Sequence, residues 1–281
     1  MKKKKTYRKI FAAGRYVLVT ILLIILLFPI FWMVVSSIQP NSYLMSMPPH
    51  FIPVEIQLDS YLKIFKNVQY MTYFKNSVIT SCGTVLLTIA LSIPAGYAFA
   101  RFKFWGCNAL RTAIMSVQMF PIVVILISLY TFYFNWGMLN TYRGLILANT
   151  VFCLPLAVSL MTSFFYTVPK ELDESAQIDG AGRIRILLQI VTPLTKPGMV
   201  AVAIYTFLQS WDDFLMSLII MQDMNMRTLP VGIAQSFLGE YAHDYASMMA
   251  FAVVGSVPIV LIFLFLQKQM VEGMTAGAVK G

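Results

Sequence analysis

Charged residues are scarce in this sequence. Only 12% of its 281 residues are Asp, Glu, Lys or Arg, whereas 58% are hydrophobic and the mean hydropathy is +0.73. Soluble domains usually carry charge on about a quarter of their residues. The shortage of charge excludes an ordinary water-soluble domain. The apolar residues also form long runs, not the spaced patterns of soluble helices and strands.

Residues that bind metals or form disulfides are also few. The three cysteines, Cys82, Cys107 and Cys153, contain no CxxC pair, and the first and third fall inside apolar runs, where small apolar side chains pack. The two histidines, His50 and His243, lie far apart and lack the spacing of metal ligands. We therefore expect no metal and no cofactor in this chain.

Motifs for nucleotide hydrolysis and covalent catalysis are absent. No GxxxxGK[ST] string occurs, so this chain is not a P-loop ATPase, and no nucleophile with a nearby base is evident. The net charge of +9 does not predict nucleic-acid binding, because the basic residues lie between apolar runs and form no compact basic domain. We expect a protein that is not an enzyme.

Six apolar runs are long enough to cross a membrane, since about 20 helical residues span roughly 30 Å of hydrocarbon. They lie near residues 16–38, 77–100, 109–134, 144–166, 198–221 and 248–266. The first is too long for a signal peptide and no small-x-small cleavage site follows it. Prolines within the runs predict kinks, not breaks, at Pro94, Pro121, Pro155 and Pro258. The prediction is an all-α membrane protein with one transmembrane domain over residues 1–281.

The distribution of Lys and Arg predicts the orientation. Six spans place both termini on one side, and 16 of the 21 basic residues fall on that side. Cytoplasmic segments beside membrane helices retain positive charge. We therefore expect a multi-pass cell-membrane protein with both termini in the cytoplasm. Residues 267–281 would form a cytoplasmic tail, and residues 39–76 and 222–247 would face outward.

The longest cytoplasmic segment, residues 167–197, predicts two short helices joined by glycines. Acidic residues follow Pro169, where a helix dipole favours negative charge. Gly180 and Gly182 end the first helix. Arg183 begins a second, with apolar residues at i, i+3, i+4 and i+7, which Pro193 terminates. Residue chemistry alone leaves two roles open, docking into a groove of another protein or lying on the membrane surface.

One string in this segment resembles the EAA loop of permease subunits in binding-protein-dependent ABC importers. It reads Glu174-Ser175-Ala176, three residues, Gly180, nine residues, Ile190, one residue and Thr192-Pro193. Ser175 replaces an alanine of the family pattern, and Thr192 replaces a leucine. Residues 95–102, 169–172, 178–181 and 271–281 are further similar to the second permease of carbohydrate importers of the maltose-transporter type.

The resemblance implies a permease that forms half of the pathway for a sugar or oligosaccharide, or alternatively for glycerol phosphate or a polyol. Its implied partners are a second, related permease, two ATPase subunits that hold ATP and Mg, and an extracytoplasmic binding protein that delivers the solute. The implied coupling residues are Glu174, Ser175, Ala176, Asp179, Gly180, Ile190 and Pro193. Glu174 would meet a basic residue of the ATPase groove, and Asp179 would brace the turn or only cap it locally.

Asp212 and Asp213 are the only carboxylates within a predicted span. Charge at membrane depth is costly, so it usually faces a cavity, a partner or a broken helix. Successive helix positions differ by about 100°, so one carboxylate would line the pathway while the other braces a helix end. Gln209 adds polarity, and Trp211 would either stack on a sugar ring or simply pack.

A different class, an ion- or proton-coupled secondary transporter, would use Asp212 and Asp213 as its site. The hydropathy shows no evident inverted repeat, and the 167–197 segment would have no assigned function in such a transporter. We therefore expect the importer permease.

Overall fold

Every regular secondary-structure element in the described part of the chain is a helix, as expected from the sequence. The computed structural model describes residues 2–237 and 244–278, and the side chains of residues 14–237 and 244–266. The long helices are α1 (Lys2–Ser37), α4 (Val68–Arg101), α7 (Tyr142–Thr167), α11 (Lys196–Trp211) and α14 (Tyr245–Ala278). His243 and the last three residues of the expected tail lie outside the described residues.

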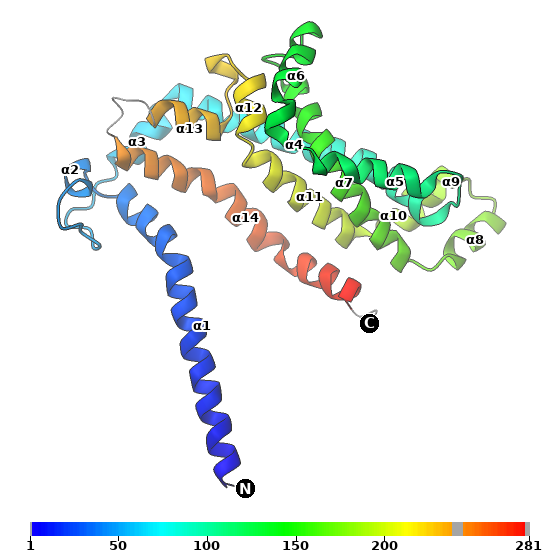
Figure 1. The fold of residues 1–281 in the computed structure, drawn as a ribbon, viewed down its shortest axis with the longest axis horizontal. Helices are drawn as coiled ribbons and strands as arrows, with labels where there is room; N and C mark the ends of the chain where they lie inside the picture. Colours follow the sequence, from blue (N-terminus) through cyan, green and yellow to red (C-terminus); the bar gives the residue numbers. More distant parts are fainter. Residues whose placement is uncertain (1, 238–243, 279–281) are drawn as a thin grey trace. The chain divides into compact units, whose positions relative to one another are not determined.

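Shorter elements connect these helices. They are α2 (Asn41–Leu44), α3 (Asp59–Lys66), α5 (Cys107–Ser116), η1 (Val117–Met119), α6 (Ile122–Asn135), α8 (Glu171–Ile178), α9 (Arg183–Arg185), η2 (Ile186–Val191), α10 (Thr192–Leu194), α12 (Leu215–Ile220), η3 (Met224–Met226) and α13 (Leu229–Phe237). Figure 1 labels the α-helices along the chain.

By length and composition, four helices of the described chain are able to cross a membrane, or up to six if each of two bent helix pairs counts as one span. The four are Gly14–Ser37, Val68–Arg101, Tyr142–Thr167 and Tyr245–Leu266. One bent pair joins Cys107–Met119 to Ile122–Asn135 at 98°, and the other joins Arg183–Leu194 to Lys196–Trp211 at 81°. The expectation of about six spans therefore agrees with the upper count.

Pro121 breaks its helix, whereas the sequence predicts only a kink there. Phe120 and Pro121 are both extended, with ψ of 126° and 120°, between η1 and α6. Proline disfavours the helical region for the residue before it and removes a backbone donor, which is the physical reason for the break. Pro94, Pro155 and Pro258 stay inside continuous helices.

The chain divides into two compact units, which are described separately. Unit 1 contains residues 1–67 and 235–256, and unit 2 contains residues 68–234 and 257–281. The single domain expected over residues 1–281 stays a prediction.

Asp244 is the polar centre of unit 1. Its carboxylate accepts a 2.8 Å hydrogen bond from the Asn41 side chain and lies 3.3 Å from Lys63 Nζ. It also accepts hydrogen bonds from the amide and hydroxyl of Ser247 and so caps α14. Burial raises the pKa of Asp244, but these hydrogen bonds and the Lys63 charge outweigh it and hold the pKa below its ordinary value. The contacts therefore stabilise the unit at neutral pH and are lost only as pH falls through that lowered pKa.

Unit 2 is built on close packing of α4, α7 and α11, which contact one another (Figure 1). A Cβ added at Gly96 of α4 would lie 2.7 Å from Met161 Cβ and 3.0 Å from the Thr162 amide nitrogen of α7. A Cβ at Gly198 of α11 would likewise collide with the ring of Phe164. Small residues let membrane helices approach closely and gain dispersion energy, which explains glycine at these positions.

We expect Gly96→Ala to lower the thermal unfolding temperature of the detergent-solubilised protein. The added methyl meets backbone of α7, which cannot move aside, and such overpacking costs about 1–3 kcal/mol. Gly14→Ala is the matched control, because nothing lies within 4 Å of its added Cβ. It should be neutral or slightly stabilising, since alanine is the better helix former by about 0.5–1 kcal/mol. Equal unfolding temperatures for the two variants would contradict the close α4–α7 contact.

Candidate functional site

The 167–197 segment folds as two helices around a glycine turn, in the arrangement that the sequence predicts. Glu171, Asp173 and Glu174 occupy the first turn of α8. Gly180 has φ +79°, a left-handed conformation that glycine adopts without strain. The amide of Ala181 donates to Ala176 O at 2.9 Å across this turn, which satisfies a carbonyl at the helix end. The second helix then runs through Arg183–Leu194.

Pro193 lies one residue before the end of the second helix at Leu194, close to the end that the sequence predicts. It lies in the first turn of α10, directly after the π-helical turn η2, and the chain turns only after Leu194. The 81° bend before α11 therefore follows Thr195 and not the proline.

One face of the two loop helices is packed into the core of unit 2. Ala176 of α8 and Ile186 and Val191 of η2 are buried in a cluster with Phe165 of α7. Ile190 is partly buried against the same cluster. The predicted coupling residues Ala176 and Ile190 thus hold the loop on the helical bundle.

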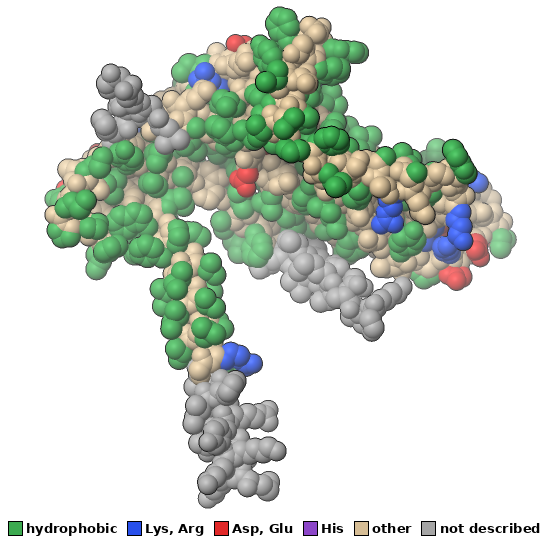
Figure 2. All heavy atoms as spheres, viewed as in Figure 1, with side chains coloured by type: hydrophobic (Ala, Val, Ile, Leu, Met, Phe, Trp, Pro, Cys, Tyr) green, Lys and Arg blue, Asp and Glu red, His purple; other side chains and the backbone are tan. Residues whose placement is uncertain are grey.

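The opposite face is exposed and mixes charge with large apolar side chains. The predicted coupling residues on it are Glu174, Ser175, Asp179, Gly180 and Pro193. The side chains of Ile178 and Ile184 are 86% and 75% exposed. Figure 2 shows acidic and basic side chains gathered at the end of unit 2 where α8 and α9 lie. Exposed apolar residues rimmed by polar ones are typical of a surface that contacts a partner.

A buried ion pair, which the sequence analysis missed, attaches α8 to α4. Arg101 Nε lies 2.8 Å from Asp173 Oδ2, and the two side chains are only 5% and 8% exposed. Tyr97 donates to the same oxygen at 3.1 Å, and Arg101 Nη2 donates to Val168 O at 2.9 Å. The available signal was an arginine at the end of a long apolar helix, together with an acidic residue at the start of the following loop helix.

The break between α11 and α12 contains both predicted pathway carboxylates, and they differ in environment. The Asp213 carboxylate accepts hydrogen bonds from Met216 N at 3.2 Å and from Ser217 N and Oγ at 2.9 Å each. It therefore caps α12 and braces that helix start. Asp212 is exposed, and its carboxylate makes no hydrogen bond or ion pair within the part of the chain that the structure describes. Asp212 is the member of the pair that faces away from the bundle core.

The other two predicted pathway residues also differ. Gln209 is exposed one turn before Asp212. Trp211 is only 2% exposed, stacks on Phe207 at 5.3 Å between ring centroids and meets Phe74 edge-on at 5.6 Å. The structure therefore places Trp211 in aromatic packing between α4 and α11.

Buried polar side chains surround the helix break. Asn149 of α7 donates to Ser210 Oγ of α11 at 3.1 Å, and that hydroxyl donates to Thr84 Oγ1 of α4 at 3.4 Å. Asn149 is also a side-chain hydrogen-bond partner of Asp213. This network joins three helices at the depth of the break, in the way that buried polar residues connect membrane helices.

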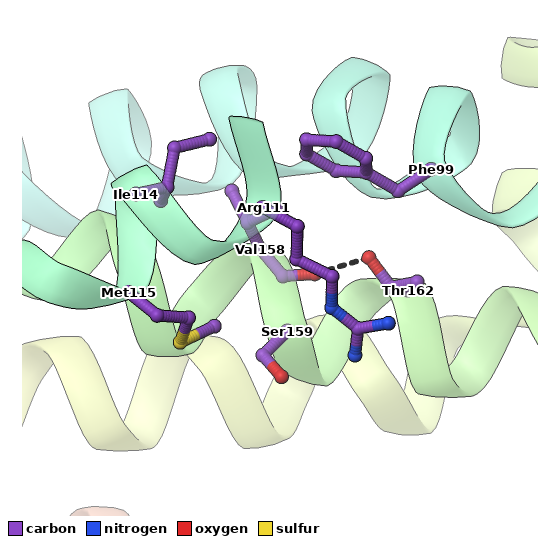
Figure 3. A pocket seen from close by; sticks show the side chains of 7 residues that line it. All are labelled: Phe99, Arg111, Ile114, Met115, Val158, Ser159 and Thr162. Atoms are coloured by element: carbon purple, nitrogen blue, oxygen red, sulfur yellow. Dashed lines mark hydrogen bonds between the residues drawn. The ribbon is translucent and has the colours of Figure 1, made fainter. Parts of the chain in front are cut away.

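A small hollow between α5 and α7 contains none of the predicted site residues. Figure 3 shows the Arg111 side chain extending from α5 toward Ser159 and Thr162 of α7, with Met115 nearby. Most of the remaining lining is apolar. The hollow offers too few convergent polar groups for a sugar site.

Comparisons with known proteins agree over nearly the whole chain. The family model described as "Binding-protein-dependent transport system inner membrane component" matches residues 92–275. A sulfoquinovosyl glycerol transport system permease protein of Agrobacterium fabrum is 34% identical over 95% of this chain and 93% of its own length. A trehalose/maltose transport system permease protein of Thermococcus litoralis is 34% identical over 92% and 93%. A galactooligosaccharides transport system permease protein of Bacillus subtilis is 33% identical over 100% and 99%.

A solved structure shows the same fold. The crystal structure of a bacterial ABC transporter involved in the import of the acidic polysaccharide alginate contains a chain with a TM-score of 0.82 to this one. The match covers 93% of this chain and 97% of that chain at 18% identity.

The two carboxylates at the helix break should differ in their contribution to stability. We expect Asp213→Ala to lower the unfolding temperature, because three hydrogen bonds at the start of α12 are lost and a helix cap is worth about 0.5–2 kcal/mol. Asp212→Ala is the control and should change stability by less than about 0.5 kcal/mol. Thermal unfolding of the two purified variants checks this. A larger fall in unfolding temperature for Asp212→Ala than for Asp213→Ala would show that Asp213 is not the residue that braces α12.

Proposed function

This chain belongs to the family of binding-protein-dependent transport system inner membrane components, and we propose that it forms half of the translocation pathway of an ATP-driven importer of a sugar or oligosaccharide. The three relatives described above carry names that each refer to a sugar or a glycoside, which supports a carbohydrate as the solute. A permease of this family is not an enzyme. ATP and Mg are bound and used by separate ATPase subunits.

The observation that carries the proposal is the two-faced loop of residues 167–197. Its inner face is buried in the bundle core, and its outer face presents charged and large apolar residues. A surface of that kind, rigidly attached to membrane helices, suits docking into a groove of a cytoplasmic ATPase. Closure of the ATPase pair would then displace the bundle itself.

Three residues have distinct roles in this docking. The exposed Glu174 carboxylate meets a basic residue of the groove. Gly180 provides the left-handed turn that sets the angle between the two loop helices. The Asp179 side chain makes no hydrogen bond to other described residues, which favours a contact with the ATPase over a purely local cap.

The full importer would contain this permease, a second related permease and two ATPase subunits. An extracytoplasmic binding protein would deliver the solute to residues 39–76 and 222–247. Both termini and the 167–197 loop lie in the cytoplasm in this proposal, in keeping with the excess of Lys and Arg on that side. Binding of ATP opens the pathway outward, and hydrolysis returns it to the inward-open state.

The α11–α12 break contributes the pathway surface of this subunit. Asp212 and Gln209 are exposed and one helical turn apart, so both reach the same water-filled space. Their oxygens accept hydrogen bonds from sugar hydroxyls, and the carboxylate repels anionic solutes. Asp213 and Trp211 hold the break in shape and do not contact the solute.

Tagged protein purified from its native host in mild detergent should carry a P-loop ATPase and a second permease. Glu174→Arg should reduce the recovered ATPase by about tenfold or more, because an attraction of about 1 kcal/mol becomes a repulsion of about the same size, and a change of about 1.4 kcal/mol is already tenfold. Gly180→Pro should do the same, because proline cannot adopt the positive φ of this turn. Quantitative mass spectrometry of the copurifying proteins measures both effects.

Glu55→Arg is the matched control, since it makes the same charge change at an exposed position outside the loop. It should leave ATPase recovery unchanged. A lone homo-oligomer without an ATPase in the parent protein would refute the importer proposal. That result would make the secondary transporter that uses Asp212 and Asp213 the better explanation.

Modification of Gln209→Cys tests the pathway surface without knowledge of the solute. With Cys82, Cys107 and Cys153 replaced by serine, we compare the reaction rates of a cationic and an anionic methanethiosulfonate in the intact complex. The cationic reagent should react faster. Asp212→Asn should lower the ratio of the two rates about tenfold. A charge about 6 Å away in water changes the activation free energy of each reagent by about 0.7 kcal/mol, in opposite directions, so the ratio changes by about 1.4 kcal/mol.

Asp213→Asn is the control for this measurement and should change the ratio by less, since that carboxylate faces α12. If neither reagent reacts with the cysteine at position 209 in either the nucleotide-free or the ATP-bound complex, the break does not line a water-filled pathway.

A further inference from the structure

We propose that α4 is a single rigid connector between the 167–197 loop and residues 224–232 at the opposite end of unit 2. Arg101 and Asp173 are the positioning residues at one end, and Asn76 is the positioning residue at the other. The inference rests on the proposed function, because it assigns the route by which movement of the coupling loop crosses the membrane.

The first attachment is made by one guanidinium group. Arg101 is the last residue of α4, and its Nε contacts Asp173 in the first turn of α8 at 2.8 Å. Its Nη2 donates at 2.9 Å to the carbonyl of Val168, the residue that follows α7. The end of α7 and the start of α8 are therefore both held by the same side chain of α4.

Aromatic contacts extend this attachment to the second loop helix. Tyr97 donates to Asp173 and packs edge-on against Phe102, with ring centroids 5.8 Å apart. The Arg183 guanidinium, at the start of the second loop helix, lies 5.0 Å from the centroid of the same Phe102 ring. Both helices of the loop are thus attached to the last turn of α4 and the residue after it.

The second attachment lies about seven helical turns away, near the other end of α4. The buried Asn76 side chain donates at 2.9 Å to the carbonyls of both Asn225 and Arg227. Ser77 Oγ accepts from Leu229 N at 2.8 Å. These hydrogen bonds hold the backbone of the 224–232 segment directly against α4.

Close packing completes this second attachment. Gly232 lies against the ring of Tyr73, one turn before Asn76, and any Cβ at position 232 would collide with that ring. Tyr142 OH also bonds Asn76 Oδ1 at 2.6 Å, so the amide is held on both of its polar atoms. The segment therefore follows α4 when α4 moves.

The helix between the two attachments has no break. From Asn76 to Arg101 it rises about 38 Å at 1.5 Å per residue, which exceeds the roughly 30 Å thickness of a hydrocarbon core. Separating Arg101 from Asp173 would leave a buried charge unpaired, and separating Asn76 from its carbonyls would leave a buried amide unpaired. Both attachments therefore persist during movement, and displacement of α8 reaches the 224–232 segment through α4.

The test uses the complex purified with its ATPase, with Cys82, Cys107 and Cys153 replaced by serine and a bimane fluorophore on Met224→Cys. Met224 is 56% exposed and lies in the attached segment. Mg-ATP with vanadate is then added to trap the closed ATPase pair. The parent complex should show a shift in bimane emission. Asp173→Asn and Asn76→Ala should each reduce that shift about fivefold or more while the ATPase still copurifies.

Two further variants separate transmission from general loss of stability. Ile204→Ala removes a side chain of α11 in unit 2 that is 4% exposed and belongs to neither attachment, and it should keep the full shift. Asp173→Glu keeps the negative charge and should recover part of the emission shift. A full shift in Asn76→Ala, or an equal loss in Ile204→Ala, would overturn the proposal. If the Asp173→Asn complex fails to assemble, the emission shift of Asn76→Ala alone decides the proposal. If the parent complex contains no ATPase, the proposed function is refuted instead.

Discussion

The ion pair between Arg101 and Asp173 determines where the 167–197 loop sits on the bundle. Both side chains are almost fully buried, Tyr97 donates a further hydrogen bond to Asp173, and Arg101 also donates to the Val168 carbonyl. Removing one partner of such a pair typically costs about 3–5 kcal/mol, because the other charge is left buried and unpaired. The loop is therefore held in one position, and its outer face, with Glu174, is presented in one orientation.

The second constraint is that backbone groups at membrane depth must be satisfied within the protein. The break between α11 and α12 exposes the first amides of α12, and the Asp213 carboxylate accepts from two of them. An acidic residue at this depth is thus explained by the break itself. Asp212, with no such partner among the described residues, is left to face the space beside the bundle.

Much of the architecture was predictable because its causes are local. Runs of apolar residues predict the membrane helices, and the acidic first turn and Gly180 predict the helix–turn–helix of the loop. The error arose at a proline. Pro121 was expected to kink a helix and instead breaks it, whereas the second loop helix ends one residue after Pro193, close to the predicted end. Whether a proline is accommodated depends on the hydrogen bonds of its neighbours, which sequence alone does not specify.

By itself, the sequence determined that this protein lies in a membrane, that its helices are long and apolar, and that residues 167–197 form a two-helix loop with a glycine turn. Those properties follow from composition and from spacing within single segments. Only the tertiary structure decided that Arg101 pairs with Asp173, that Asn76 holds residues 225–227, and that Asp213 braces a helix while Trp211 packs. Most of these contacts join residues 72 to 151 positions apart, and such pairings depend on how helices pack and not on any local pattern.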